Sequence, residues 1–145
     1  MALKDFFTLD QQKEIGFSIE KAELNTSGEI RVHLEEKCKI DPIIRAVAVF
    51  EKLKMHATEQ RNGVLFYLAV KDKKFAVIGD KGINDLVDSN FWEDVKSEML
   101  TQFKNANFTE GLCKGIEMAG EKLKINFPFQ ANDINELSNE ISFGD

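Results

Sequence analysis

The chain is poor in several residues that mark special classes of protein. Among its 145 residues are two cysteines, two prolines, two histidines and nine glycines, which excludes collagen-like and low-complexity chains. No Cys-x-x-Cys pair or zinc-type Cys/His spacing is present, because His33 and His56 lie near no second suitable ligand. The two cysteines, Cys38 and Cys113, are therefore expected to be reduced residues that serve packing.

Long apolar runs and an excess of positive charge are also missing. The longest apolar run, Val64 to Val70, is far shorter than the ~20 residues of a membrane span. The first seven residues include Asp5 and do not resemble a secretory leader. Nineteen basic against 25 acidic residues give a net charge of −6, which argues against binding to nucleic acid or an anionic membrane. We expect a cytoplasmic monomer with no membrane insertion and no nucleic-acid partner.

The pattern of apolar residues and helix caps predicts one domain, at residues 1–127, because the length suits a single core. Its elements follow in the order helix, strand, helix, strand, strand, helix, helix. The residues that cap the four helices are expected to be Thr8, Asp41, Asp88 or Ser89, and Asn107. The strands are expected at residues 29–35, 64–70 and 75–78.

The first strand alternates apolar and polar residues, whereas the second is apolar on both faces. This predicts that the second strand is central and that the first lies at an edge or is partly uncovered, with His33 at the surface. A right-handed crossover makes these two strands parallel, and the tight turn at residues 71–74 makes the third antiparallel to the second. The expected fold is an α/β fold, a three-layer α/β/α sandwich around a small mixed β-sheet.

Residues 128–145 form an acidic C-terminal tail. They contain no Lys or Arg and carry −4 of the net −6. Ile134, Leu137 and Ile141 recur at roughly helical spacing, so the tail is either frayed or a short amphipathic segment that docks on this domain or on a partner. We expect residues 130–145 to be more mobile than the body, with at most one docked turn.

Acidic residues gather where the expected topology brings three strand ends together. Carboxylates crowded beside the carbonyl end of the first helix repel one another unless a cation neutralises them, and Ca²⁺ or Mg²⁺ prefers such oxygen ligands. Asp80 and Asp85 are the favoured ligands, with Asp88 or Glu29 next, and Ca²⁺ is favoured over Mg²⁺. The alternative is a solvated loop in which Asp88 only caps the following helix.

Three segments resemble the TPM domain family, whose members include a thylakoid-lumen acid phosphatase and a photosystem II repair protein. They are Asn62 to Ala69, Lys73 to Gly79 with Gly82-Ile83, and Phe103-x-x-Ala106-x-Phe108-x-Glu110-Gly111-Leu112. The resemblance runs from about Thr8 to Leu123. It implies the three-layer fold and, in some members, a divalent metal, often calcium, on acidic loop residues at one end of the sheet.

This chain departs from the family pattern at two positions. Arg61 stands where many members have Asp, and Gly79-Asp80-Lys81-Gly82 replaces a Gly-x-Gly loop, so one ligand is lost and Asp80 is gained. The leading hypothesis is a divalent-metal-binding domain that acts as an interaction or regulatory module. The alternative is a weak metal-dependent acid phosphatase in which Arg61 holds a phosphomonoester. A third hypothesis is a scaffold whose acidic tail recruits a basic partner.

Overall fold

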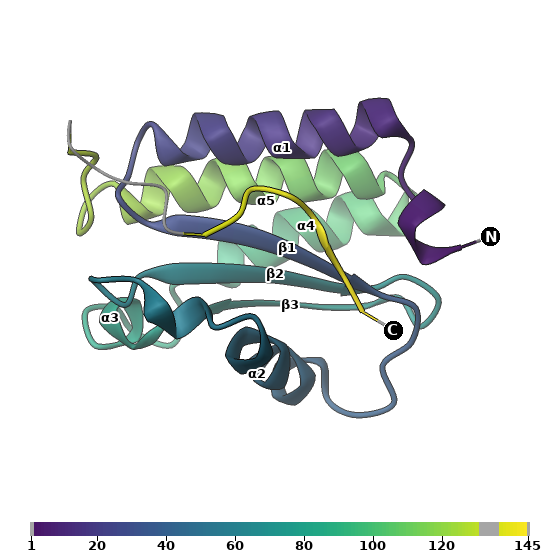
Figure 1. Cartoon of the computed structure of the whole chain (residues 1–145), viewed down its shortest axis with the longest axis horizontal. Coiled ribbons are helices and arrows are strands. Elements are labelled where there is room, and N and C mark those ends of the chain that lie inside the picture. Colours follow the sequence, from purple (N-terminus) through teal and green to yellow (C-terminus); the bar gives the residue numbers. More distant parts are fainter. Residues whose placement is uncertain (1, 131–136, 145) are drawn as a thin grey trace.

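The computed structural model describes residues 2–130 and 137–144, which form three layers (Figure 1). The helices are α1 (Leu9–Glu23), α2 (Pro42–Lys52), α3 (Lys81–Asn84), α4 (Glu93–Lys104) and α5 (Phe108–Leu123), with short 3₁₀ turns at Leu3–Asp5 and Met55–Ala57. The strands are β1 (Glu29–Glu35), β2 (Gly63–Ala69), β3 (Lys74–Gly79) and β4 (Ser142–Phe143).

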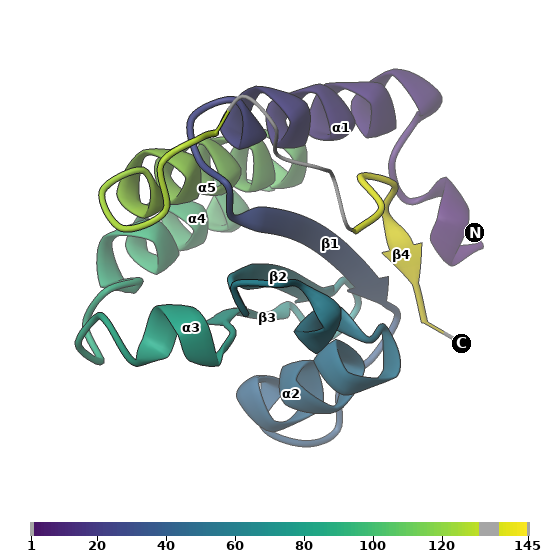
Figure 2. The same ribbon diagram turned by 60° about the vertical axis from the view of Figure 1, so that its left-hand side comes forward.

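Helices cover both faces of the sheet. Helices α1, α4 and α5 pack on one face and α2 on the other (Figures 1 and 2). The apolar residues accordingly form two clusters, a larger one under α1, α4 and α5 and a smaller one under α2. Strand β2 is buried along its whole length because it contributes to both clusters. The α/β sandwich expected from the sequence is confirmed.

The sheet topology also agrees with the sequence. In the described residues the strands follow the order β3-β2-β1-β4, with β1 parallel to β2 and β3 antiparallel to β2. The register pairs Glu29 with Gly63 and Val64 with Gly79, so all three strands have one end at the same edge of the sheet.

The first strand differs from expectation. Its residues are buried on both faces apart from the half-buried Arg31, and the histidine expected at the surface, His33, is only 4% exposed. The reason is the C-terminal strap, our name for residues 137–144, which lies along β1 (Figure 2). Its strand β4 pairs in parallel with His33 and Leu34 of β1.

The docking of the strap decides between the two interpretations of the tail for its described residues. The docked element is a strand rather than the single turn expected, and it docks on this domain. Ile134 and the acidic residues 133 and 136 lie outside the described residues. The boundary between residues 127 and 128 and the mobility of the tail stay predictions.

Two of the four predicted caps form side-chain hydrogen bonds, and a third, Asn107, stands at the predicted N-cap position without one. Thr8 forms the expected capping box with Gln11, and Asp41 accepts from the Ile43 amide. The other two helices begin without a side-chain cap, α4 after Trp92 and α5 after Asn107. Burial against the core stabilises these two helices instead, since Val95 and Met99 on α4 and seven residues on α5 are buried.

Candidate functional site

The edge at which the three strand ends meet carries a pocket of about 590 Å³ between α2, α3 and the end of β3. Its apolar wall includes Val47, Phe50 and Ile78. Its polar lining consists of Glu51, His56, Arg61, Asp80, Lys81 and Asn84. Two of the polar residues, Asp80 and Arg61, were singled out from the sequence.

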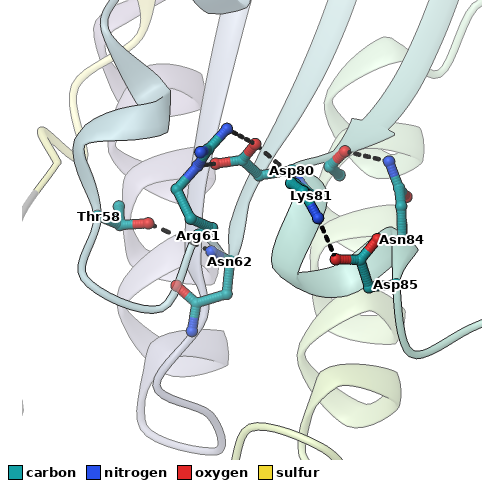
Figure 3. Close-up of polar contacts among 8 residues, drawn as sticks. Thr58, Arg61, Asn62, Asp80, Lys81, Asn84 and Asp85 are labelled. Carbon is teal, nitrogen blue, oxygen red and sulfur yellow. Dashed lines mark hydrogen bonds and ion pairs between the residues drawn. The ribbon is translucent and has the colours of Figure 1, made fainter.

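Asp80 is the most constrained carboxylate at this edge. Its side chain is buried, with 7% of the residue exposed, and accepts the Lys81 amide at 2.7 Å at the start of α3. Arg61 Nε and Nη2 donate to the two carboxylate oxygens at 2.8 and 2.9 Å (Figure 3). The guanidinium itself is exposed, and its hydrogen bonds to Asp80 raise the pKa of Arg61. The result is a bidentate pair, buried on the carboxylate side and open to water on the other.

The backbone holds this pair in place. Arg61 has a φ of 51°, in the left-handed region, at the turn that leads into β2. The Gly82 amide donates to the Arg61 carbonyl at 2.8 Å, so α3 lies directly against that turn. A methyl group on Gly82 would be 2.2 Å from the Gln60 carbonyl oxygen and 2.6 Å from that of Arg61. Only glycine permits this approach.

Each of the other predicted metal ligands has a partner of its own. Asp85 follows α3 as its C-cap and is paired with Lys81 at 2.5 Å, and Figure 3 shows its carboxylate directed at the Lys81 ammonium. Asp88 accepts the Asn90 amide in the loop before α4 and does not cap that helix. Glu29 is buried at the start of β1, where it accepts the Leu137 amide of the strap at 2.7 Å.

The described residues contain no group of three His, Cys, Asp or Glu side chains placed to hold a metal ion. Asp80 and Asp85 have the oxygen donors that Ca²⁺ prefers, but each faces a cationic side chain. A divalent cation therefore fits here only when Arg61 and Lys81 have left the two carboxylates. Both Arg61 and Lys81 are exposed, so they can leave the carboxylates without unfolding the helix.

Glu23 is a second unusual carboxylate at this edge of the sheet. Burial raises its pKa to about 7, and the charge of Glu29 adds to the rise, although the Ile30 amide donates to its Oε2 at 3.1 Å. The sequence placed Glu23 and Glu29 at the same end of the sheet, and their proximity adds to the effect of burial on the pKa of Glu23.

Sequence reasoning missed a buried polar cluster near the opposite end of β1. Glu35 is bound by Arg45 of α2, which donates from Nε at 2.8 Å, and by the Tyr67 hydroxyl at 2.7 Å. Burial alone would raise the pKa of Glu35, but these hydrogen bonds and one from His33 lower it to about 2. The only signal in the sequence was the period-two run of polar residues, which also fits an exposed face.

Within this cluster the hydrogen bonds assign the tautomer of His33. Burial lowers the pKa of His33, so the ring is neutral near pH 7. Its Nε2 lies 3.2 Å from the ionised Glu35 and must donate to it, which leaves Nδ1 to accept from the Ser142 hydroxyl at 2.9 Å. The cluster therefore ties the strap to β1.

Comparison with known proteins identifies a family and two proteins of similar structure. The family model of the TPM domain matches residues 2–122. A solution structure of the protein BA42 from the psychrophilic bacterium Bizionia argentinensis is 50% identical, with a TM-score of 0.92 and 99% of both chains covered. The N-terminal domain of cg2496 from Corynebacterium glutamicum has a TM-score of 0.64 at 8% identity, over 94% of this chain and 80% of that one, which shows a shared fold alone. No curated protein sequence matches.

Proposed function

Since this chain belongs to the TPM domain family, some of whose members are phosphatase-like, we propose that it is a divalent-cation-binding module whose site is the pocket edge at Asp80. The observation that carries the proposal is the buried Asp80 carboxylate, held on both oxygens by an exposed guanidinium. A cation already occupies the place where a metal ion would bind, but it is a side chain that can move into water.

The proposed ligands are Asp80 and, after release of Lys81, Asp85, with backbone carbonyls and waters completing the shell. Ca²⁺ suits a flexible loop with mixed carboxylate and carbonyl donors better than Mg²⁺, which demands near-octahedral geometry. Asp88 and Glu29 are not part of the proposed set, because each accepts a backbone amide elsewhere. The cation would neutralise Asp80 and Asp85 and leave Arg61 and Lys81 free to meet an anionic partner.

Because Arg61 competes with the metal ion for Asp80, removing the charge of Arg61 should strengthen the binding of Ca²⁺. In Arg61→Gln the internal competitor loses its charge, so Ca²⁺ should bind severalfold more tightly than to the unaltered protein. Asp80→Asn should abolish binding while still capping α3, because Asn caps helices as well as Asp. Amide chemical shifts followed during Ca²⁺ titration measure both affinities and show which residues respond.

The matched control is Lys71→Gln. Lys71 is exposed and paired with Glu36, so the substitution makes the same charge change away from the pocket. It should leave the affinity for Ca²⁺ unaltered. Equal affinities in Arg61→Gln and the unaltered protein, or undiminished binding in Asp80→Asn, would contradict the proposal.

Hydrolysis of phosphomonoesters is the second candidate, favoured by the side chains of Arg61, Lys81 and His56 in one pocket. In that case Arg61 would bind the phosphate and its loss would reduce turnover. The two candidates therefore predict opposite consequences for Arg61→Gln. Turnover of a generic phosphomonoester, measured with and without Ca²⁺ or Mg²⁺, separates them.

A further inference from the structure

Helix α2 carries a second apolar stripe, on the side turned away from the sheet. Its inner side chains, Ala46, Val49 and Phe50, are buried. The outer stripe consists of Ile40, just before the helix, with Ile43, Ile44 and Val47, which are 50%, 48%, 63% and 48% exposed. Val47, at the end of the stripe, also lines the pocket described above. Within the helix, spacings of four and three residues place Ile43 and Ile44 beside Val47 on one face. No other element lies outside α2 in the described fold (Figures 1 and 2).

Lysines gather beside the N-terminal half of this stripe. The segment of residues 36–40 lies against the turn between β2 and β3, since the Cys38 amide donates to Asp72 at 2.8 Å and Lys74 Nζ donates to the Cys38 carbonyl at 2.9 Å. This contact brings two lysine-bearing segments side by side, one with Lys37 and Lys39 and the other with Lys71, Lys73 and Lys74. The ammonium group of Lys74 is held by the Cys38 carbonyl and that of Lys71 by Glu36. The acidic residues in the same segments are Glu36, Asp41 and Asp72, so five positive and three negative charges leave a local charge of +2 on a chain of −6.

We propose that this isoleucine–lysine face, formed by the outer stripe and the five lysines, docks on the surface of an anionic lipid bilayer. Branched apolar side chains beside a group of lysines can enter the headgroup region while the ammonium groups remain at the charged lipid surface. A protein partner fits the face less well, because lysine is depleted at protein–protein interfaces. The stripe ends at Glu51, so the N-terminal half of α2 makes the contact.

The negative charge of the whole chain does not oppose this docking. Charges further apart than about 8 Å are largely screened at physiological ionic strength, so the local charge of the contacting face governs adsorption. The described strap, with Glu140, lies along β1 and not on α2. The sequence argument against an anionic membrane averaged over all 44 charged residues, 19 basic and 25 acidic, and could not detect a local excess.

The test is co-sedimentation of the full chain with vesicles. The protein should bind vesicles of equal parts phosphatidylglycerol and phosphatidylcholine, bind pure phosphatidylcholine at least tenfold more weakly, and be released by salt. Lys37→Glu/Lys39→Glu should weaken binding at least tenfold, since each lysine near the surface contributes roughly fivefold. Ile43→Ser/Ile44→Ser should weaken binding at low salt without changing the steepness of its dependence on salt.

Matched controls lie in the other helical layer. Lys21→Glu/Lys114→Glu makes the same charge change on α1 and α5, and Leu24→Ser/Ile125→Ser removes two apolar side chains that are 67% and 83% exposed. Both should bind vesicles as the unaltered protein does. The proposal is overturned if anionic vesicles do not bind, if the face variants behave like the controls, or if light scattering shows a dimer that Ile43→Ser/Ile44→Ser converts to monomer. The last result would assign the face to a second copy of the chain.

Discussion

Gly82 is the residue on which the geometry of the pocket edge depends most directly. A Cβ atom at this position would collide with the carbonyl oxygens of Gln60 and Arg61, which are backbone atoms that cannot rotate away. We expect Gly82→Ala to lower the free energy of unfolding by about 1–3 kcal/mol, as overpacking does elsewhere. Urea denaturation measures the loss.

A glycine in open space provides the comparison. Gly16 lies inside α1, and a methyl group there would meet nothing within 4 Å. Gly16→Ala should therefore stabilise the protein by up to about 1 kcal/mol, because alanine is the better helix former. A loss of stability at both glycines, or at neither, would show that the close approach at Gly82 is not what matters.

Residues whose role depends on their immediate neighbours in the chain were predictable, and those whose role depends on distant segments were not. Thr8 and Asp41 were recognised as caps because their partners lie within three residues. The partner of Asp80 is Arg61, which the sequence placed at the same edge but could not pair with it. His33 was placed wrongly because Ser142, 109 residues away, completes its surroundings.

At the scale of elements, the strap buries the polar face of β1. The Leu137 amide donates to Glu29, Ser142 to His33, and the Gly144 amide to the Leu34 carbonyl at 2.7 Å. Ile141 packs against the larger core cluster. A strand of two residues has too little pattern to be predicted, since periodicity needs at least four residues to register.

Truncation after residue 136 tests how much the strap stabilises the fold. The core of the domain lies earlier in the chain, so the truncated protein should still unfold in one cooperative transition. Its free energy of unfolding should fall by about 1–3 kcal/mol, because Glu29 and His33 lose partners and Ile141 is removed. Denaturant titration gives both the cooperativity and the loss.

Single substitutions separate the contribution of the Ser142–His33 hydrogen bond to stability from that of the rest of the strap. Ser142→Ala removes the donor to the buried His33 and should account for about 1 kcal/mol of the loss. Ser138 is exposed and, among the described residues, accepts the Glu140 amide next to it in the strap, so Ser138→Ala should be nearly neutral. Truncated protein as stable as the full chain would mean that the strap covers β1 without stabilising it.

At the scale of the whole molecule, the sequence was sufficient for the layers and the strand order of the body. The apolar run of β2 required a central strand, and the crossover and the tight turn then determined the direction of β1 and β3. None of the helices in the described residues is long and apolar enough to cross a bilayer. Ion pairing at the pocket could not be predicted, because whether carboxylates meet a metal or an internal cation depends on side-chain placement.

Two carboxylates of β1 and α1, Glu35 and Glu23, make the stability of the molecule depend on pH in opposite senses. The pKa of Glu35 is lowered to about 2, so its contribution is present above about pH 4.5 and is lost as the pH falls toward 2. The pKa of Glu23 is raised to about 7, so the folded state binds the extra proton and stability falls as the pH rises from 4.5 to 7. If only these two groups are considered, the free energy of unfolding should be greatest near pH 4.5.

Glu23→Gln isolates the second effect. Glutamine keeps an oxygen for the Ile30 amide but cannot ionise beside Glu29. Above pH 7 the ionised Glu23 costs the folded protein at most about 3 kcal/mol, so the variant should melt at a higher temperature than the unaltered protein at pH 8. At pH 4.5 the two melting temperatures should nearly coincide, because Glu23 is then protonated in the folded state. A difference of the same size at both pH values would mean that packing, and not the buried charge, distinguishes the two side chains.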